Sequence, residues 1–281
     1  MDHFSKPVAL VTGASSGFGL LTAIALARNG YQVVASMRDL GKSGLLLEQA
    51  EQAHVKGSLE TVQIDVTNHS SIEQAVSDIM YTYGRMDALI NNAGFAVGGY
   101  VEDVPMDAWR AQFETNVFGV IAMTQAVLPH MRVQKSGCIV NLSSVSGLSA
   151  FPGYAPYSAS KFAIEGFSES LRLEMQPFGV RVVLVEPGAY KTEIWRKGFD
   201  AVHTTEESPY WKPLSRMLIY SRKAAAHAPD PQEVADQIVR IVDNPRPKLR
   251  YPMGRGVKLG LRARSLLPWK WYEGVLTRVL K

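Results

Sequence analysis

Short apolar runs alternate along this chain with longer segments in which apolar residues recur every three or four positions. Unbroken apolar runs are typical of buried strands, and the longer period is typical of helices that bury one face. The predicted strands cover residues 7–12, 32–36, 59–64, 86–90, 137–142, 180–185 and 249–252. The predicted helices cover residues 20–29, 40–57, 70–84, 106–131, 156–176 and 230–242, the last opened by Asp230 as cap and Pro231 at its first position.

Strand and helix therefore alternate six times, which favours a parallel sheet with right-handed crossovers. The 281 residues are enough for one large α/β domain with an ample core. We expect a single doubly wound domain spanning residues 1–281, with helices on both faces of the sheet.

An insertion at about residues 189–229 interrupts this rhythm. Its bulky side chains are Tyr190, Ile194, Trp195, Phe199, Tyr210, Trp211, Leu214, Met217, Leu218 and Tyr220. A long insertion after the carboxyl end of a strand is well placed to cover a ligand, so we predict a lid over an apolar substrate. A pair of surface helices that pack on the core is the alternative.

Composition adds few constraints. Hydrophobic residues make up 46% of the chain and charged residues 20%, as is usual for a soluble globular protein. The single cysteine, Cys138, lies in an apolar run, so we expect a buried thiol and no disulfide within the chain. The N-terminus lacks a signal-peptide core and no apolar run is long enough to span a membrane, so we expect a cytoplasmic protein. The six histidines are scattered, and we expect no metal site.

The net charge of +4 is unevenly distributed. Residues 246–281 hold ten Lys or Arg and one acid, a net +9, which leaves −5 for the rest. The apolar residues of this basic segment are Leu266, Leu267, Trp269, Trp271, Leu276 and Leu280. We expect the extension at about 255–281 to cover substrate or contact another subunit, with a weak peripheral membrane contact as the alternative. No recognition motif supports nucleic-acid binding.

The first strand runs into a glycine-rich turn, Gly13-Ala14-Ser15-Ser16-Gly17-Phe18-Gly19, and then into a helix. This setting is typical of dinucleotide binding, because glycines allow a tight turn and the helix N-terminus faces the pyrophosphate. The same residues also fit G-x-S-x-G, the nucleophile turn of serine hydrolases. In that alternative Ser15 would be the nucleophile, and His203 or His227 would complete a triad.

The end of the second strand indicates which dinucleotide is bound. In an NAD site an acid near this point binds the ribose hydroxyls, but here Met37 takes that place and Arg38 follows. A neutral residue beside an arginine would accept a 2′-phosphate, with Ser15 as a possible donor, so we predict NADP(H). Asp39 could pair with Arg38 and weaken this prediction. Asp65 and Asn91 also lie at strand ends, where parallel sheets bind ligands.

The residues best suited to catalysis are Tyr157 and Lys161. Their spacing places both side chains on one face of a helix, and Pro156 puts Tyr157 in its opening turn. A nearby ammonium and a helix N-terminus would both lower the pKa of the phenol, which suits proton exchange with a carbonyl and alcohol pair. Asn116 inside the helix predicted at 106–131 needs a partner or a task.

Taken together, these residues resemble the short-chain dehydrogenase/reductase family over roughly residues 6–255. The motifs that carry the resemblance are Thr12-Gly13-x-x-x-Gly17-x-Gly19, Asn91-Asn92-Ala93-Gly94, Asn116, Ser144, Tyr157-x-x-x-Lys161 and Pro187-Gly188-x-x-x-Thr192. The residues at positions 34–40, the apolar insertion and the extended C-terminus look most like the branch with 17β-hydroxysteroid and retinol dehydrogenases.

The resemblance implies a Rossmann fold with sheet order 3-2-1-4-5-6-7 and a catalytic tetrad of Asn116, Ser144, Tyr157 and Lys161. Ser144, rather than Ser143, stands at the family's distance of thirteen residues from the tyrosine. The implied cofactor contacts, which also include the two tetrad residues Tyr157 and Lys161, are Gly13, Ser15, Ser16, Gly17, Phe18, Gly19, Arg38, Asp65, Val66, Asn91, Ala93, Gly94, Pro187, Gly188 and Thr192.

The implied activity is NADP(H)-dependent interconversion of a carbonyl and an alcohol on a bulky apolar substrate such as a steroid or retinoid. Tyr157 would exchange the proton, Ser144 would bind the same oxygen, Lys161 would bind the nicotinamide ribose, and Asn116 would hold a relay water. The helices at 106–131 and 156–176 would suit a homodimer or homotetramer. A non-catalytic NADP-binding sensor or scaffold is the alternative.

Overall fold

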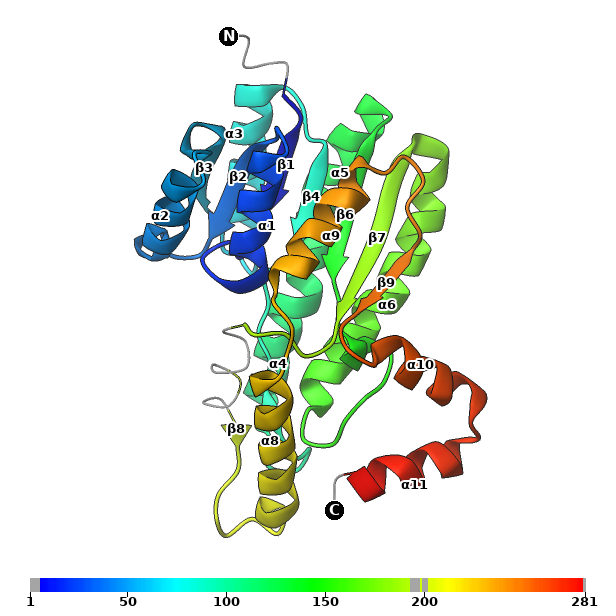
Figure 1. Cartoon of the computed structure of the whole chain (residues 1–281). Helices are drawn as coiled ribbons and strands as arrows, with labels where there is room; N and C mark the ends of the chain where they lie inside the picture. The colour runs from blue at the N-terminus through cyan, green and yellow to red at the C-terminus, as the bar shows by residue number, and fades with distance from the viewer. Residues whose placement is uncertain (1–5, 193–197, 199–201, 280–281) are drawn as a thin grey trace.

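The computed structural model describes residues 6–192, 198 and 202–279, and is built around one seven-stranded parallel sheet with helices on both faces (Figure 1). In spatial order the strands are β3 Leu59–Gln63, β2 Gln32–Met37, β1 Val8–Val11, β4 Ala88–Asn91, β6 Gly137–Leu142, β7 Val180–Pro187 and β9 Arg250–Met253. This order confirms the predicted Rossmann topology. The central strands β1, β2, β4 and β6 are buried throughout, as their unbroken apolar runs require.

Two helical layers bury the two faces of the sheet. The helices are α1 Gly17–Arg28, α2 Gly44–Gln52, α3 His69–Tyr83, α4 Met106–Phe113, α5 Gly119–Gln134, α6 Ala155–Met175, α8 Trp211–Ala226, α9 Gln232–Asp243, α10 Val257–Leu266 and α11 Trp269–Val279. One core cluster lies beneath α1, α2 and α9, where Leu20, Leu46 and Ile238 are buried. A second lies beneath α3, α5 and α6, and a small third cluster lies between α5, α6 and β7. The carboxyl ends of the strands are thereby left open to bind a ligand.

Three helix predictions need correction. The segment 40–57 is a 3₁₀ turn at Leu40–Lys42, then α2, then a second 3₁₀ turn at Lys56–Ser58, because His54 takes a positive φ of 56° that ends the helix. The segment 106–131 is divided by a π-helical turn at Glu114–Phe118, and its second helix, α5, continues to Gln134. The helix predicted from residue 230 begins at Gln232, whose N–H donates to Asp230 Oδ1 over 2.8 Å.

The insertion forms α8 and the short strand β8 Val202–His203. β8 pairs with β5 Gly98–Gly99, which follows β4, in a two-stranded sheet that the sequence pattern did not predict. Ile194, Trp195 and Phe199, which were predicted to line the lid, lie outside the described residues. Tyr190 is not a lid residue. It is 1% exposed, packs edge-on against Phe18 and donates to Glu233.

The C-terminal extension forms α10 and α11, which lie beyond β9 at the same end of the sheet as α8 (Figure 1). No helix among the described residues is long and apolar enough to cross a bilayer. Cys138 is fully buried in β6, as expected from its apolar surroundings.

Candidate active site

The glycine-rich turn after β1 is fastened to the end of β4 by Thr12 and Asn92. Thr12 Oγ1 accepts the N–H groups of Asn92 and Ala93, each over 3.0 Å. The Asn92 amide donates to the carbonyls of Thr12 and Gly13, over 2.8 and 3.1 Å. Gly13 has φ +68°, and a Cβ on it would lie 2.8 Å from Ala93 Cα. The sequence motifs contained Thr12 and Asn92, but only the structure shows that their side chains hold this turn in place.

The start of α1 fits a bound pyrophosphate. Its N-cap residue, Ser16, has extended backbone and its side chain makes no capping hydrogen bond, which leaves the first N–H groups open to an anion. A Cβ on Gly19 would overlap Gly13 O and the Asn92 amide, so only glycine allows this close approach. Thr192 lies on the other side of the turn, with its Cβ 3.7 Å from the position of a Cβ on Gly17. The structure thus brings Gly13, Gly17, Gly19 and Thr192 together.

The end of β2 presents one cation. Met37 is 3% exposed, whereas Arg38 extends into solvent. Asp39 accepts the N–H of Gly41 over 2.9 Å and pairs with Lys42 at 3.7 Å. Asp39 therefore pairs with Lys42 and not with Arg38, and the Arg38 side chain is available to bind an anion.

Asp65 and Val66 follow β3, as predicted. Asp65 Oδ1 accepts the N–H and hydroxyl of Thr67, over 3.0 and 2.8 Å. Val66 is 8% exposed and lies against Gly119, where any Cβ would come within 2.9 Å of its side chain. These contacts fix the rim of the site at the edge where an adenine would bind.

Asn91 has a different environment from the one expected. Its amide donates to Asn141 Oδ1 over 2.9 Å and to Thr124 over 3.2 Å, and its own Oδ1 is buried without a partner. The Asn141 amide in turn donates to Ser168 over 2.9 Å. The Asn91 side chain therefore links β4 to β6 and α5, and through Asn141 to α6, inside the protein and does not line the open edge.

The catalytic residues predicted from the sequence converge where β6 and β7 end and α6 begins. Ser144 follows β6, and its Oγ accepts the N–H of Ser146 over 3.1 Å and donates to Pro187 O over 3.4 Å. Tyr157 is in the first turn of α6, as Pro156 predicted. Lys161 Nζ donates to Leu142 O over 2.7 Å and lies 5.7 Å from the centre of the Tyr157 ring.

The expected lowering of the Tyr157 pKa is wrong for the protein without cofactor. Burial raises the pKa of Tyr157, and the hydrogen bond with Ser144 opposes that rise only in part. Burial also lowers the pKa of Lys161 to about 8, opposed by the carboxylate of Glu165 one turn further along α6. Desolvation is the largest cause of both shifts, because both groups are removed from water. Tyr157 is thus a protonated donor at neutral pH.

Asn116 is in the π-helical turn between α4 and α5 and is 1% exposed. π-turns within helices frequently mark functional sites. Its amide donates to Phe95 O over 2.9 Å and to Ser160 Oγ over 3.4 Å, and its Oδ1 accepts the N–H of Phe95 over 3.1 Å. These bonds fix the segment after β4 against α6. The relay water remains a prediction.

A partly buried cluster of charges behind Lys161 was not predicted from the sequence. Arg250 of β9 binds Glu165 and Glu169 of α6, each over 2.8 Å, and lies 3.5 Å from Glu186 of β7. Glu186 is fully buried, and neither of its oxygens has a hydrogen-bond partner. Burial, and then the nearby Glu165, raise the pKa of Glu186 to about 8. In the sequence, the sign of this cluster was a glutamate, Glu186, directly after the apolar strand predicted at 180–185.

Because Glu186 is buried in this cluster, we expect it to make the free energy of unfolding depend on pH. The folded pKa of Glu186 lies above its ordinary value of 4.5, so the folded state holds that proton more tightly. Stability from this group is full below about pH 4.5 and is lost as pH rises towards about 8. Glu186→Gln should remove that loss, and the variant should gain roughly 1–4 kcal/mol relative to wild type between pH 5 and pH 8. Urea unfolding of both proteins at pH 5 and pH 8 measures their free energies of unfolding. A difference between variant and wild type that is the same at both pH values would contradict the prediction.

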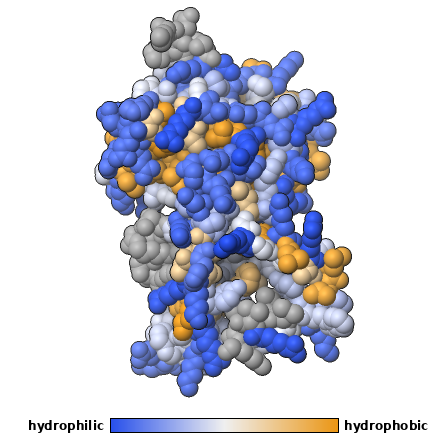
Figure 2. Space-filling model, in the orientation of Figure 1, coloured by the Kyte–Doolittle hydropathy of each residue, from blue (hydrophilic) through white to orange (hydrophobic). Residues whose placement is uncertain are grey.

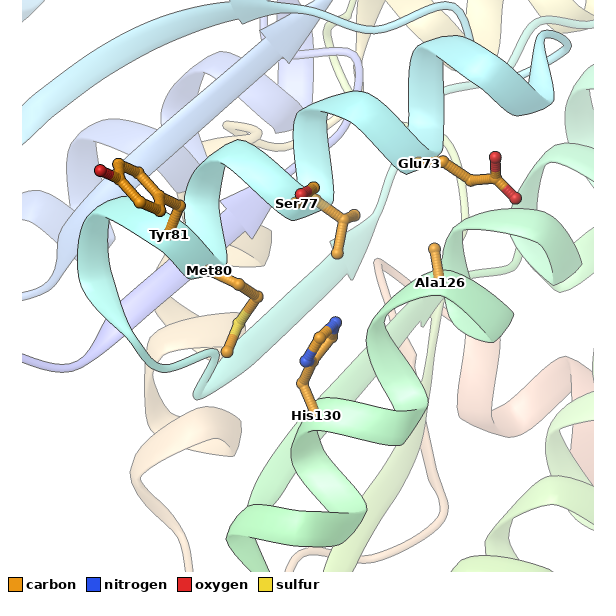
Figure 3. Close-up of a pocket in the computed structure, with 7 residues that line it drawn as sticks. Glu73, Ser77, Met80, Tyr81, Ala126 and His130 are labelled. Carbon is orange, nitrogen blue, oxygen red and sulfur yellow. The ribbon is translucent and has the colours of Figure 1, made fainter.

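The surface also has an open hollow of about 520 Å³ between α3 and α5, away from the catalytic residues (Figure 3). Its lining residues are Glu73, Val76, Ser77, Met80, Tyr81, Ala126 and His130. None of them belongs to the site built above, and we assign this hollow no role in the chemistry.

The sheet topology and the arrangement of Ser144, Tyr157 and Lys161 are those expected of an oxidoreductase with a Rossmann fold. Residues 7–202 match the family model described as short chain dehydrogenase, and the chain belongs to this family. It is 46% identical over 279 residues to an uncharacterized oxidoreductase of Bacillus subtilis, YusZ, covering 98% of this chain and 99% of that protein. It is 37% identical over 262 residues to 3-ketodihydrosphingosine reductase of Bacteroides thetaiotaomicron, covering 93% of each. It is 39% identical over 252 residues to retinol dehydrogenase 8 of Homo sapiens, covering 86% of this chain and 79% of that protein.

Solved structures agree on the fold. A short-chain dehydrogenase from Streptomyces avermitilis has a TM-score of 0.81 and 34% identity, covering 98% of this chain and 96% of that one. A short-chain dehydrogenase/reductase from Burkholderia phymatum in complex with NAD has a TM-score of 0.81 and 25% identity, covering 94% and 95%. A metagenomic short-chain oxidoreductase in complex with NADP has a TM-score of 0.70 and 25% identity, covering 90% and 98%.

The serine-hydrolase alternative has no support. The ring of His227 binds its own helix through the carbonyl of Lys223, over 3.0 Å, and His203 belongs to the small strand β8. Ser15 therefore belongs to the dinucleotide turn of a short-chain dehydrogenase.

Proposed function

We propose that this protein is an NADP(H)-dependent oxidoreductase that interconverts a carbonyl and an alcohol on a bulky apolar substrate, such as a steroid, a retinoid or another hydrophobic ketone or aldehyde. The observation that carries the proposal is the convergence of Ser144, Tyr157 and Lys161 at the sheet edge that also holds the glycine turn. Two relatives are named for apolar substrates, a retinol and a ketodihydrosphingosine.

The protein's own groups supply proton transfer and charge stabilisation. When bound, the dinucleotide supplies or accepts the hydride. The neutral phenol of Tyr157 donates its proton to the substrate oxygen as negative charge develops there, and the Ser144 hydroxyl binds the same oxygen. These contacts strengthen with the developing charge, so they accelerate the reaction more than they tighten substrate binding. Lys161 stabilises the phenolate that remains.

The apolar wall beside the site comes from α8. Leu214 and Met217 of α8 are buried, and a Cβ on Gly153 would lie 2.9 and 3.9 Å from them. Gly153 directly precedes the N-terminal end of α6, which carries Tyr157. The insertion thus packs against the segment that leads into the catalytic helix, which supports its proposed role as a lid over an apolar substrate.

The decisive experiment follows oxidation of NADPH, and separately of NADH, by absorbance with a panel of steroid, retinoid, aliphatic and aromatic carbonyl compounds. We expect NADPH-dependent turnover of the bulky apolar compounds. If NADPH binds and no compound is reduced, the non-catalytic sensor or scaffold becomes the better proposal. The organised Ser144 and Tyr157 argue against it, because cofactor binding alone does not require a proton donor.

Arg38→Ala tests the cofactor preference. Loss of the guanidinium removes the partner for a 2′-phosphate, so the KM for NADPH should rise roughly 10-fold to 100-fold while that for NADH changes little. Lys42→Ala is the matched control, because Lys42 is a nearby exposed cation already paired with Asp39. Equal KM changes for both dinucleotides would show that Arg38 is not the selector.

Two expectations about the whole protein remain proposals. A homodimer or homotetramer is supported by apolar side chains left exposed on the surface at and beside α5 and α6, namely Phe118 at 53%, Val133 at 78% and Leu173 at 71%. The cytoplasmic location also remains a prediction.

A further inference from the structure

The outer surface of the C-terminal extension combines exposed apolar side chains with an excess of cations. Four large apolar residues of these two helices are exposed. They are Leu259 at 74% and Leu266 at 82% on α10, and Trp269 at 63% and Trp271 at 68% on α11. Leu259 and Leu266 are seven residues apart, which places them on one face of α10. Figure 2 shows apolar groups gathered over α10 at the right-hand edge of this view.

Cations lie among these apolar residues. Lys258, Arg262, Lys270 and Arg278 are exposed on the same two helices, and Glu273 is the only acid in the +9 segment that contains them. Arg262 lies between the two exposed leucines on α10, three residues after one and four before the other. Leucine and tryptophan beside lysine and arginine are the combination that binds an interfacial helix to an anionic bilayer.

The extension is firmly attached to the candidate active site. Tyr272 of α11 is 9% exposed and shares a 2.6 Å hydrogen bond with Ser149, in the segment between Ser144 and α6. The Arg264 guanidinium of α10 lies 5.8 Å from the ring centre of Phe162, the residue after Lys161. These contacts attach one side of the extension to the domain, with Tyr272 buried, and leave its apolar and basic side outward.

The start of α10 also reaches the floor of the site. A Cβ on Gly188 would lie 2.8 Å from the Val257 side chain, and the N–H of Gly188 donates to Met253 O over 2.9 Å. The surface carried by α10 and α11 therefore lies beside the residues that would position the cofactor and substrate. α8, the proposed lid, lies at the same end of the molecule (Figure 1).

We propose that α10 and α11 form a docking surface for an anionic lipid bilayer, which holds the mouth of the active site at the membrane. The mixed side chains match both components of such a surface: the leucines and tryptophans enter the boundary between headgroups and acyl chains, and the cations meet lipid phosphates. The advantage for catalysis rests on the proposed function, because an apolar carbonyl compound concentrates in the bilayer. Docking itself does not depend on that function.

Vesicle co-sedimentation of the full chain tests the proposal, with 70:30 phosphatidylcholine and phosphatidylglycerol compared with pure phosphatidylcholine. Wild type should bind the anionic vesicles, and 0.5 M salt should weaken binding strongly. The double variant Arg262→Glu with Leu266→Ser should lower the partition coefficient at least tenfold. Trp271→Ser on α11 is a second, independent variant and should lower it several-fold.

The matched control is Arg110→Glu with Met106→Ser, an exposed cation and an exposed apolar residue four positions apart on α4. This control should bind vesicles like wild type. NADPH binding, measured on every variant, shows that each is folded and keeps this test separate from the proposed activity. An inactive protein that still binds anionic vesicles would overturn the proposed function and leave the docking surface intact.

Three results would overturn the docking surface. The first is equal vesicle binding by the α10 variant and wild type, and the second is no binding of wild type to anionic vesicles. The third is that the α10 substitutions change only the mass in sedimentation equilibrium, or only the binding of a DNA duplex. In that third case, the partner of this surface would be a second copy of the chain or a nucleic acid.

Discussion

Tyr157→Phe should lower kcat by about 10²-fold to 10⁴-fold, the range expected when a positioned proton donor is lost. The phenol is neutral at pH 7, burial raises its pKa further, and it shares a hydrogen bond with Ser144, the other residue proposed to bind the substrate oxygen. Affinity for NADPH should change by less than about threefold, because the phenol hydroxyl is not part of the glycine turn. Single-turnover kinetics and dinucleotide titration measure the two effects separately.

Tyr83→Phe is the matched control for this substitution. The Tyr83 hydroxyl, at the end of α3, donates to Glu60 of the edge strand β3 over 2.7 Å. Neither residue belongs to the catalytic helix α6. Losing this hydroxyl should cost roughly 1–3 kcal/mol of stability and leave kcat unchanged. Near-normal turnover by Tyr157→Phe would remove Tyr157 from the mechanism.

Gly19→Ala should weaken NADPH binding about 100-fold and lower the free energy of unfolding by roughly 1–3 kcal/mol, the usual cost of overpacking. The added methyl group would overlap Gly13 O and the Asn92 amide. Both groups belong to the hydrogen-bonded turn that presents the start of α1 to the pyrophosphate. Isothermal titration with NADPH and chemical unfolding measure the two effects.

Gly166→Ala is the control, because no atom lies within 4 Å of a Cβ added at this position in α6. The same change should there stabilise the protein by roughly 0.5–1 kcal/mol, since alanine is the better helix former. If Gly19→Ala lowers the free energy of unfolding and Gly166→Ala raises it, the close approach at Gly19 is the cause of the destabilisation. Unchanged NADPH affinity in Gly19→Ala would show that the turn tolerates a side chain.

The two predictions concern opposite halves of one site. Gly19 acts through backbone contact across β1 and β4, whereas Tyr157 acts through a side chain between β6 and α6. Both belong at the carboxyl edge of the sheet because parallel strands end there together. If Gly19→Ala weakens NADPH binding and Tyr157→Phe lowers kcat without weakening it, cofactor binding and proton transfer are carried by separate parts of the site.

Several features of the molecule were determined by the sequence alone. The unbroken apolar runs at β1, β4 and β6 predicted buried parallel strands, because a strand covered on both faces has no polar side. The period of the segments between them predicted helices on both faces. The positions of Gly13, Tyr157 and Lys161 on those elements predicted a turn for dinucleotide binding and a proton-transfer pair. Ser144 was added by the family resemblance, and the structure places it near Tyr157 and Lys161.

Only the tertiary structure decided the electrostatics of that site. A sequence places Tyr157 and Lys161 one turn apart, but the pKa of each depends on how much water their surroundings exclude, and desolvation dominates here. The same holds for Arg250, which reaches Glu165 from β9 although 85 residues separate them. It also holds for Tyr272, which binds Ser149 across 123 residues and leaves the basic side of α10 and α11 outward. Local sequence patterns record which face a residue prefers, whereas burial and long-range pairing arise only when distant segments pack.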